Sequence, residues 1–244
     1  MPVQFTPTPK PYLSVPISEC GEPLLPVGGR FACVSPAPYV ALGAPYGNRS
    51  PFWLREDVVR RLAIAQAALR QKHPEWRLLL FDGFRPLAVQ RFMVEYSYRQ
   101  LLERRGLQAD GLSPEQQQVL YEEVFTFWAL PSEDPATPPP HSTGGAVDLT
   151  LADANGQAIW MGSEIDEISQ RSQPDYFLDS SVPDAAVFHA RRQLLNQAMT
   201  TAGFLRHPNE WWHFSYGDQL WAWQLNQRDR RSARRAIYGG MSSQ

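Results

Sequence analysis

The sequence has few cysteines, no long apolar run and no strong excess of either charge. Its 244 residues include two cysteines, Cys20 and Cys33, which form no CxxC pair. This scarcity excludes a disulfide-stapled secreted fold and a cysteine-rich zinc module. No apolar run approaches the ~18 residues that a transmembrane helix needs. The first residues show no basic stretch followed by an apolar block, so we expect no secretory signal.

The charge balance also excludes some functions. The formal net charge is −2, whereas dedicated nucleic-acid binders usually carry a strong basic excess. We interpret the arginine-rich segment RDRRSARR, residues 228–235, as a solvated tail. The hydrophobic fraction is 43% and the aromatic fraction 12%, which suffice for a sizeable core. We therefore expect a globular cytoplasmic protein without nucleic-acid or membrane partners.

Proline is concentrated at the start of the chain. Seven of the 22 prolines lie in the first 26 residues. Because proline fixes φ and lacks an amide donor, residues 1–29 are predicted to run extended across the body. No internal repeat or long flexible linker divides the rest. We therefore expect a single domain over residues 30–225 and an arginine-rich tail over residues 226–244.

Apolar periodicity and turn residues predict a mixed α+β fold. Predicted helices cover residues 55–72, a segment that begins at 86, residues 113–128 and residues 184–202. Predicted strands cover residues 76–81, 146–151 and 158–161, the last two joined by a turn at Asn155-Gly156, with two further short strands between residues 204 and 216.

Three of the five histidines are predicted to have no functional role. His73 and His207 each precede a proline at an expected turn, so we interpret them as surface or turn residues. His189 lies in a predicted helix next to two arginines, which indicates a partly exposed helical side chain.

The other two histidines each have an acidic residue nearby. His141 precedes Asp148 by seven residues in HSTGGAVD, and the two glycines between them allow a sharp bend. Glu210 precedes His213 by three residues in EWWH. Imidazole nitrogens and carboxylate oxygens are suitable zinc ligands. From spacing alone, the alternative to a metal site is a capped turn with a buried carboxylate.

Three separated motifs, HSTGGAVDLTL, EWWHFSY and DGFRP, together resemble the zinc D-alanyl-D-alanine dipeptidases related to the vancomycin-resistance dipeptidase. The resemblance spans about residues 82–216. It implies one zinc ion held by His141, Asp148 and His213. The implied fold is a small antiparallel sheet flanked by helices, with the zinc site on the sheet, as in Hedgehog-like and D,D-peptidase domains.

The resemblance also implies roles for three further residues. Glu210 would accept a proton from the attacking water and pass it to the leaving amine, and Arg85 would stabilise the oxyanion. The alternative for Arg85 is a salt bridge to Asp82. Asp166, in MGSEID, would bind the substrate ammonium, and its alternative role is a solvated acidic turn.

One departure from the family pattern precedes the first histidine. Two prolines, Pro139 and Pro140, stand where the resistance dipeptidase has two serines that contribute to the substrate pocket. Substrate geometry is therefore expected to differ from that of the resistance enzyme even where the zinc chemistry is shared.

The function implied by the resemblance is zinc-dependent hydrolysis of D-Ala-D-Ala to two D-alanines. One alternative is a peptidoglycan D,D- or L,D-carboxypeptidase of the same fold, against which Asp166 argues because it would serve a free amino terminus. Another is a non-catalytic zinc-binding partner module, as in Hedgehog signalling domains. Glu210 and Arg85 argue against that module, because a binding protein needs neither a base nor an oxyanion donor.

Overall fold

The computed structural model describes residues 10–229, 231 and 233–241. Its helices are α1 (Pro38–Ala41), α2 (Glu56–Lys72), α3 (Leu87–Arg104), α4 (Pro114–Phe127), α5 (Ala185–Thr201) and α6 (Gln219–Arg228). Short 3-10 helices are η1 (Pro11–Ser14), η2 (Ala109–Gly111), η3 (Pro140–Thr143) and η4 (Gln170–Ser172). The strands are β1 (Leu24–Pro26), β2 (Ala32–Cys33), β3 (Trp53–Arg55), β4 (Arg77–Asp82), β5 (Ala146–Ala152), β6 (Leu205–Arg206) and β7 (His213–Ser215).

The main sheet has five strands in the order β2-β4-β5-β7-β6. The four strands from β4 to β6 pair antiparallel, which confirms the predicted α+β fold and its antiparallel sheet. Edge strand β2 pairs parallel with β4, because the chain between them crosses over through α2. Strands β1 and β3 form a separate antiparallel pair.

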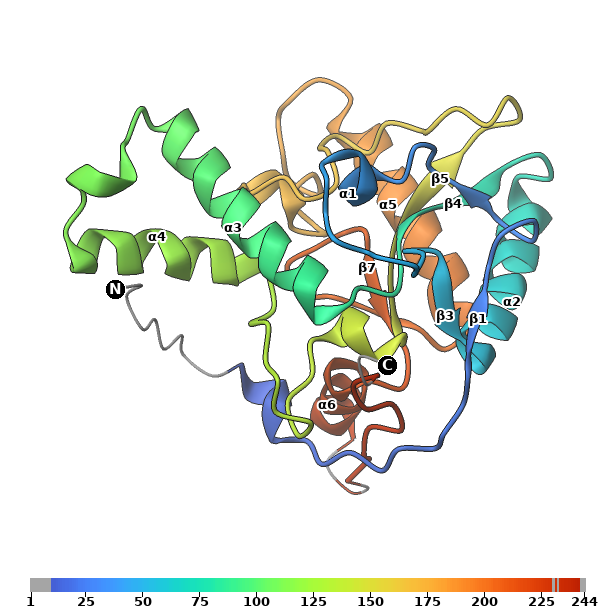
Figure 1. The fold of residues 1–244 in the computed structure, drawn as a ribbon. Helices are drawn as coiled ribbons and strands as arrows, with labels where there is room; N and C mark the ends of the chain where they lie inside the picture. Colours follow the sequence, from blue (N-terminus) through green and yellow to red (C-terminus); the bar gives the residue numbers. More distant parts are fainter. Residues whose placement is uncertain (1–9, 230, 232, 242–244) are drawn as a thin grey trace.

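Helix α2 packs against α5 and β4 (Figure 1), and α5 also packs against β6. The stripe on α2 that faces them consists of Val58, Leu62, Ala65 and Leu69, all fully buried. Acidic residues in the first turn and basic residues in the last complement the helix dipole. The helix ends before His73-Pro74, as the sequence predicts.

Helices α3 and α4 form an arm that projects from the body (Figure 1, green). Their facing sides form a second apolar cluster, in which the rings of Tyr98 and Tyr121 stack at 4.2 Å. Helix α4 begins at a capping box, where Ser113 Oγ accepts the Gln116 amide and the Gln116 side chain accepts the Ser113 amide. The base of this arm borders the candidate site.

The predicted helices are confirmed to within one or two residues, but the strand predicted over 158–161 is wrong. A single bridge joins Ala152 to Ala158, and the Ile159 amide donates to the Leu151 carbonyl oxygen at 2.8 Å. The chain then turns at Gly162, whose φ is +91°. Helix α6 was not predicted; its N-cap Asp218 accepts the Trp221 amide at 2.8 Å.

The described part of the N-terminal segment packs on the domain beside α6 (Figure 1). The Gln219 amide group donates to the carbonyl oxygens of Leu13 and Val15 at 3.2 and 2.6 Å. Farther on, Ile17 bridges Ala236 from the C-terminal segment. Residues 1–9, 230, 232 and 242–244 lie outside the described residues, so the predicted domain boundaries stay a prediction.

Both cysteines are free thiols, Cys20 exposed and Cys33 half-buried. Of the helices in the described ranges, none has the length and apolarity needed to cross a bilayer.

Candidate metal centre and active site

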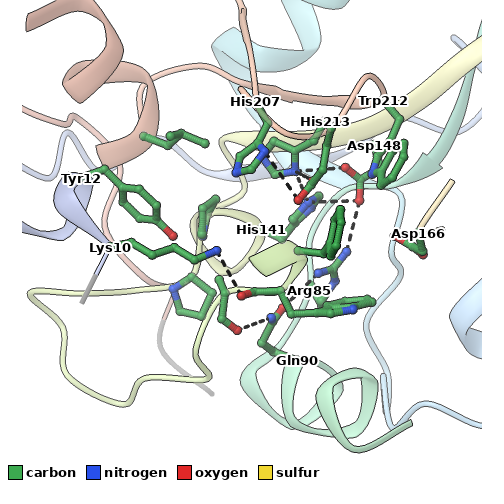
Figure 2. Close-up of a pocket in the computed structure, with 17 residues that line it drawn as sticks. Lys10, Tyr12, Arg85, Gln90, His141, Asp148, Asp166, His207, Trp212 and His213 are labelled. Carbon is green, nitrogen blue, oxygen red and sulfur yellow. Dashed lines mark hydrogen bonds and ion pairs between the residues drawn. The ribbon is translucent and has the colours of Figure 1, made fainter. Parts of the chain in front are cut away.

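Three side chains from three elements meet at one point beside the sheet. Asp148 on β5 lies directly opposite His213 on β7, and His141 lies on η3 just before β5. Their candidate ligand atoms all lie within 4.8 Å of one another, and all three side chains are buried. His141 Nε2 lies 3.2 Å from Asp148 Oδ2, and His213 Nδ1 lies 3.1 Å from Asp148 Oδ1 (Figure 2). The structure therefore brings together the three predicted ligands.

Two glycines make this arrangement possible. Gly144 ends η3 with a φ of +73°, a conformation that residues with a Cβ rarely adopt. A Cβ on Gly145 would lie 2.6 Å from the Tyr216 carbonyl oxygen. The chain can therefore turn from His141 into the central strand only where both residues lack side chains.

Replacing Gly145 with alanine is expected to lower the free energy of unfolding by about 1–3 kcal/mol, because the methyl group would displace the β7 end of the sheet. The matched control is Gly111→Ala, where the added Cβ meets nothing within 4 Å. Urea unfolding of both variants measures the difference. Equal urea midpoints would show that the sheet accommodates the methyl group without a loss in the free energy of unfolding.

One nitrogen of each imidazole contacts a residue outside the group of candidate ligands, which leaves the other ring nitrogen, here called the inner nitrogen, facing the group. His141 Nδ1–H donates to the Gly83 carbonyl oxygen at 2.7 Å, so the lone pair lies on Nε2. His213 Nε2 contacts Ser215 Oγ at 3.3 Å, which leaves Nδ1 as its inner nitrogen. The two inner nitrogens are 3.0 Å apart. Two ring nitrogens that face each other beside a carboxylate are an arrangement that a cation stabilises.

Asp148 supplies the negative charge of this group. Burial acts to raise the pKa of its carboxyl, but His141 and His213 hold that pKa well below its ordinary value. Among the described residues its buried Oδ1 has no hydrogen-bond partner. Two imidazoles and one carboxylate fit a zinc ion and leave a coordination position open for a water or substrate oxygen.

Glu210 lies beside the three ligand candidates without belonging to their group. Its Oε2 is 3.7 Å from His213 Nδ1, and its buried Oε1 has no hydrogen-bond partner in the described part of the chain. Burial, and then the charge of Asp148, raise the pKa of Glu210 well above its ordinary value. A buried carboxyl with a raised pKa can accept and return a proton near neutral pH.

His207 lies at the predicted turn, but it is wrong that it is a surface residue, because its side chain is buried and lines the same pocket. Its Nδ1 accepts the Asn209 amide at 3.2 Å and lies 3.6 Å from Glu210 Oε1. Burial, and then His213, hold the pKa of His207 well below its ordinary value. Because β6 and β7 pair antiparallel, His207 comes to lie opposite His213. The pairing register of the two short strands predicted between residues 204 and 216 could have indicated that His207 lies close to His213.

Arg85 forms the salt bridge expected of it and also reaches the site. Its guanidinium lies 2.8 Å from Asp82 and 3.2 Å from Asp148 Oδ2. It also packs over the rings of Tyr39 and Trp128, at 5.0 and 4.9 Å from their centres. Arg85 is therefore held in place by these contacts, with its charge facing the candidate metal ligands.

Asp166 lies in the loop between β5 and η4 and lines the pocket. Its φ of +63° is uncommon for a residue with a Cβ, and such backbone strain often marks functional positions. The Tyr39 hydroxyl donates to Asp166 Oδ2 at 2.7 Å. Burial, together with the charge of Asp148, raises the pKa of Asp166 to about 7. This partnered, half-buried carboxyl differs from the solvated turn considered as its alternative.

The pocket itself joins these groups in one chamber (Figure 2). Pro139 and Pro140 form part of its wall beside His141. The N-terminal segment contributes Lys10 and Tyr12, whose place in the site is not indicated by any motif in the sequence.

Comparisons with known proteins agree with this arrangement. A family model described as D-Ala-D-Ala dipeptidase matches residues 34–231. The chain is 48% identical over 237 residues, 94% of its length, to a D-alanyl-D-alanine dipeptidase of Synechocystis, 96% of which is covered. It is 46% identical over 74 residues to an Escherichia coli D-alanyl-D-alanine dipeptidase, covering 30% of this chain and 36% of the other.

A solved structure was also found, a mutant of the vancomycin-resistance D,D-pentapeptidase VanY in complex with Zn(II). It has a TM-score of 0.42 and 16% identity, and the match covers 75% of this chain and 84% of that one. The family match and the 48% identity across nearly the whole chain make this protein a member of the D-Ala-D-Ala dipeptidase family.

Proposed function

We propose that this protein is a zinc metallopeptidase that hydrolyses the dipeptide D-Ala-D-Ala to two D-alanines. The observation that carries the proposal is the buried group of His141, Asp148 and His213 with Glu210 beside it. These three residues would hold the ion. Zinc bound there would supply Lewis-acid polarisation of the scissile carbonyl and acidify a water molecule.

The remaining side chains have roles that follow from their positions. Glu210 would hold the proton of the attacking water on a carboxyl oxygen and return it to the leaving amine. Arg85, fixed against the aromatic rings behind it, would place its positive charge near the developing oxyanion. Because both groups are buried, water would not screen either interaction.

The experiment that tests this function measures D-alanine release from D-Ala-D-Ala by purified protein, with and without a chelator. An amino-blocked dipeptide and a longer stem peptide are assayed in parallel. Chelator-sensitive cleavage of the free dipeptide alone is the expected result. Cleavage of the longer peptide would instead identify a carboxypeptidase, and zinc binding without any cleavage would identify a binding module.

Asp166 is proposed to bind the substrate ammonium. Replacing it with asparagine keeps the shape and removes the charge, so kcat/KM for the free dipeptide should fall about 10- to 100-fold. Cleavage of an N-acetylated dipeptide, already poor, should be unchanged. The matched control is Glu164→Gln, an exposed acid in the same loop. Equal losses on both substrates would exclude Asp166 as the ammonium partner.

We also propose that the enzyme acts in the cytoplasm. The two free thiols fit a reducing compartment, in which disulfides are rare. The only ligand that the proposal requires besides zinc is the dipeptide.

A further inference from the structure

Lys10 brings a positive charge to the pocket from the far end of the sequence. It precedes η1 and lines the same chamber as the metal-ligand candidates. Its ammonium donates one hydrogen bond, to the Trp128 carbonyl oxygen at 3.2 Å. Burial lowers the pKa of this group, and the charge of Glu210 acts to raise it, although among the described residues no carboxylate lies within ion-pair distance of the ammonium. An ammonium can donate three hydrogen bonds, so donors remain for a ligand.

The segment that carries Lys10 is held firmly in place. Helix η1 packs on α6, and Gln219 ties the carbonyl oxygens of Leu13 and Val15 to that helix. The next aromatic residue, Tyr12, is buried and also lines the pocket. Lys10 and Tyr12 together separate this pocket from an outer groove that they also line. The segment is therefore a wall of the chamber.

The charges in the pocket are arranged with opposite signs on opposite sides. Figure 2 shows Lys10 on one side and Asp166 on the other, with His141 and Arg85 between them. A free dipeptide is a zwitterion whose ammonium and carboxylate lie at its two ends. If Asp166 takes the ammonium and the peptide bond lies at the metal site, the carboxylate must point toward the side on which Lys10 lies.

We infer that Lys10 is the residue that binds the C-terminal carboxylate of the substrate, with the Tyr12 side chain closing the pocket behind it. This inference rests on the proposed dipeptidase function and extends it to the leaving D-alanine. The carboxylate would give the ammonium a counter-ion within ion-pair distance, which none of the described residues supplies. Pro139 and Pro140, which lack side-chain donors, could not serve this purpose from the neighbouring wall.

The first test compares D-Ala-D-Ala with its C-terminal amide in wild-type protein and in Lys10→Met. The substitution is expected to lower kcat/KM for the free acid about 10- to 100-fold, the usual effect of losing a charged hydrogen bond. Cleavage of the amide should change less than about threefold. Lys10→Arg should keep most of the activity on the free acid, because a guanidinium also donates charged hydrogen bonds to a carboxylate. The matched control is Lys72→Met, because Lys72 is the other lysine in the chain and its ammonium contacts Gln197 on the outer surface.

The second test does not depend on catalysis. A short pulse of an amine-acetylating reagent is applied to wild-type protein, and the acetylation of Lys10 and Lys72 is quantified by peptide mass spectrometry. Saturating D-Ala-D-Ala should slow acetylation of Lys10 at least fivefold, whereas the amide should not, and Lys72 serves as the internal reference. Equal acetylation of Lys10 with and without the free dipeptide would overturn the inference.

The two tests distinguish failure of this inference from failure of the proposed dipeptidase function. If wild-type protein cleaves the dipeptide but Lys10→Met loses the same factor on the free acid and on the amide, Lys10 does not bind the carboxylate and the inference is wrong. If wild-type protein neither cleaves the dipeptide nor protects Lys10, the proposed function and the inference both fail.

Discussion

Replacing Glu210 with alanine is expected to reduce kcat for D-Ala-D-Ala about 10²- to 10⁴-fold while zinc stays bound. The side chain lies next to the ligand candidates but is not one of the three that converge. Its removal therefore takes away the proton acceptor and leaves the donor set complete. Steady-state kinetics and zinc content measured on the same preparation test both parts.

The substitution should not weaken the fold. Glu210 is a buried carboxyl whose Oε1 has no hydrogen-bond partner among the described residues, so alanine removes an unfavourable burial. The melting temperature of Glu210→Ala should equal or exceed that of the wild type. Glu75→Ala, at an exposed position, is the control for both measurements. Loss of zinc from Glu210→Ala would instead identify Glu210 as a ligand or as a support for one.

Removing the metal is expected to abolish hydrolysis and to lower the melting temperature by about 10 °C. At zinc concentrations near 1,000 times its Kd, binding to the folded state alone contributes about 4 kcal/mol. For a chain of this size, each kcal/mol shifts the melting temperature by about 2–4 °C. Dialysis against a chelator, followed by calorimetry and by assay after zinc is added back, measures both effects.

Replacing one of the candidate histidine ligands should abolish hydrolysis without a chelator. His141→Ala removes one of the three converging ligand atoms, so zinc content should fall well below one per chain and added zinc should not restore activity. The control is His73→Ala, since His73 stacks on Trp76 at the end of α2. Full zinc content and activity in His141→Ala would contradict the assignment of the metal centre.

The local parts of the site could be predicted from the sequence. HSTGGAVD is a continuous stretch in which two glycines allow the turn from His141 into β5, and β5 is long and apolar enough to be recognised as a buried strand. The motif in which Glu210 and His213 stand three residues apart is equally local. The sheet register then places Asp148 opposite His213, two of the ligands that the resemblance implied, and periodicity alone could not show this pairing.

Interpretations that depended on local exposure were less reliable. His207 precedes a proline, which is typical of a surface turn, yet the β6–β7 hairpin carries it into the pocket. The strand expected over 158–161 has suitable residues but too few partners to extend beyond one bridge. In both cases the packing of neighbouring elements outweighed the local signal.

By itself the sequence determined the four longest helices, four of the strands and the set of metal-binding and catalytic candidates, because periodicity, capping and short motifs are properties of neighbouring residues. Only the tertiary structure decided what surrounds that set. Tyr39 reaches Asp166 across 127 positions, and Lys10 reaches Trp128 across 118. Such contacts form when distant segments pack around one core. The spacing of residues within a short stretch of sequence therefore cannot predict them.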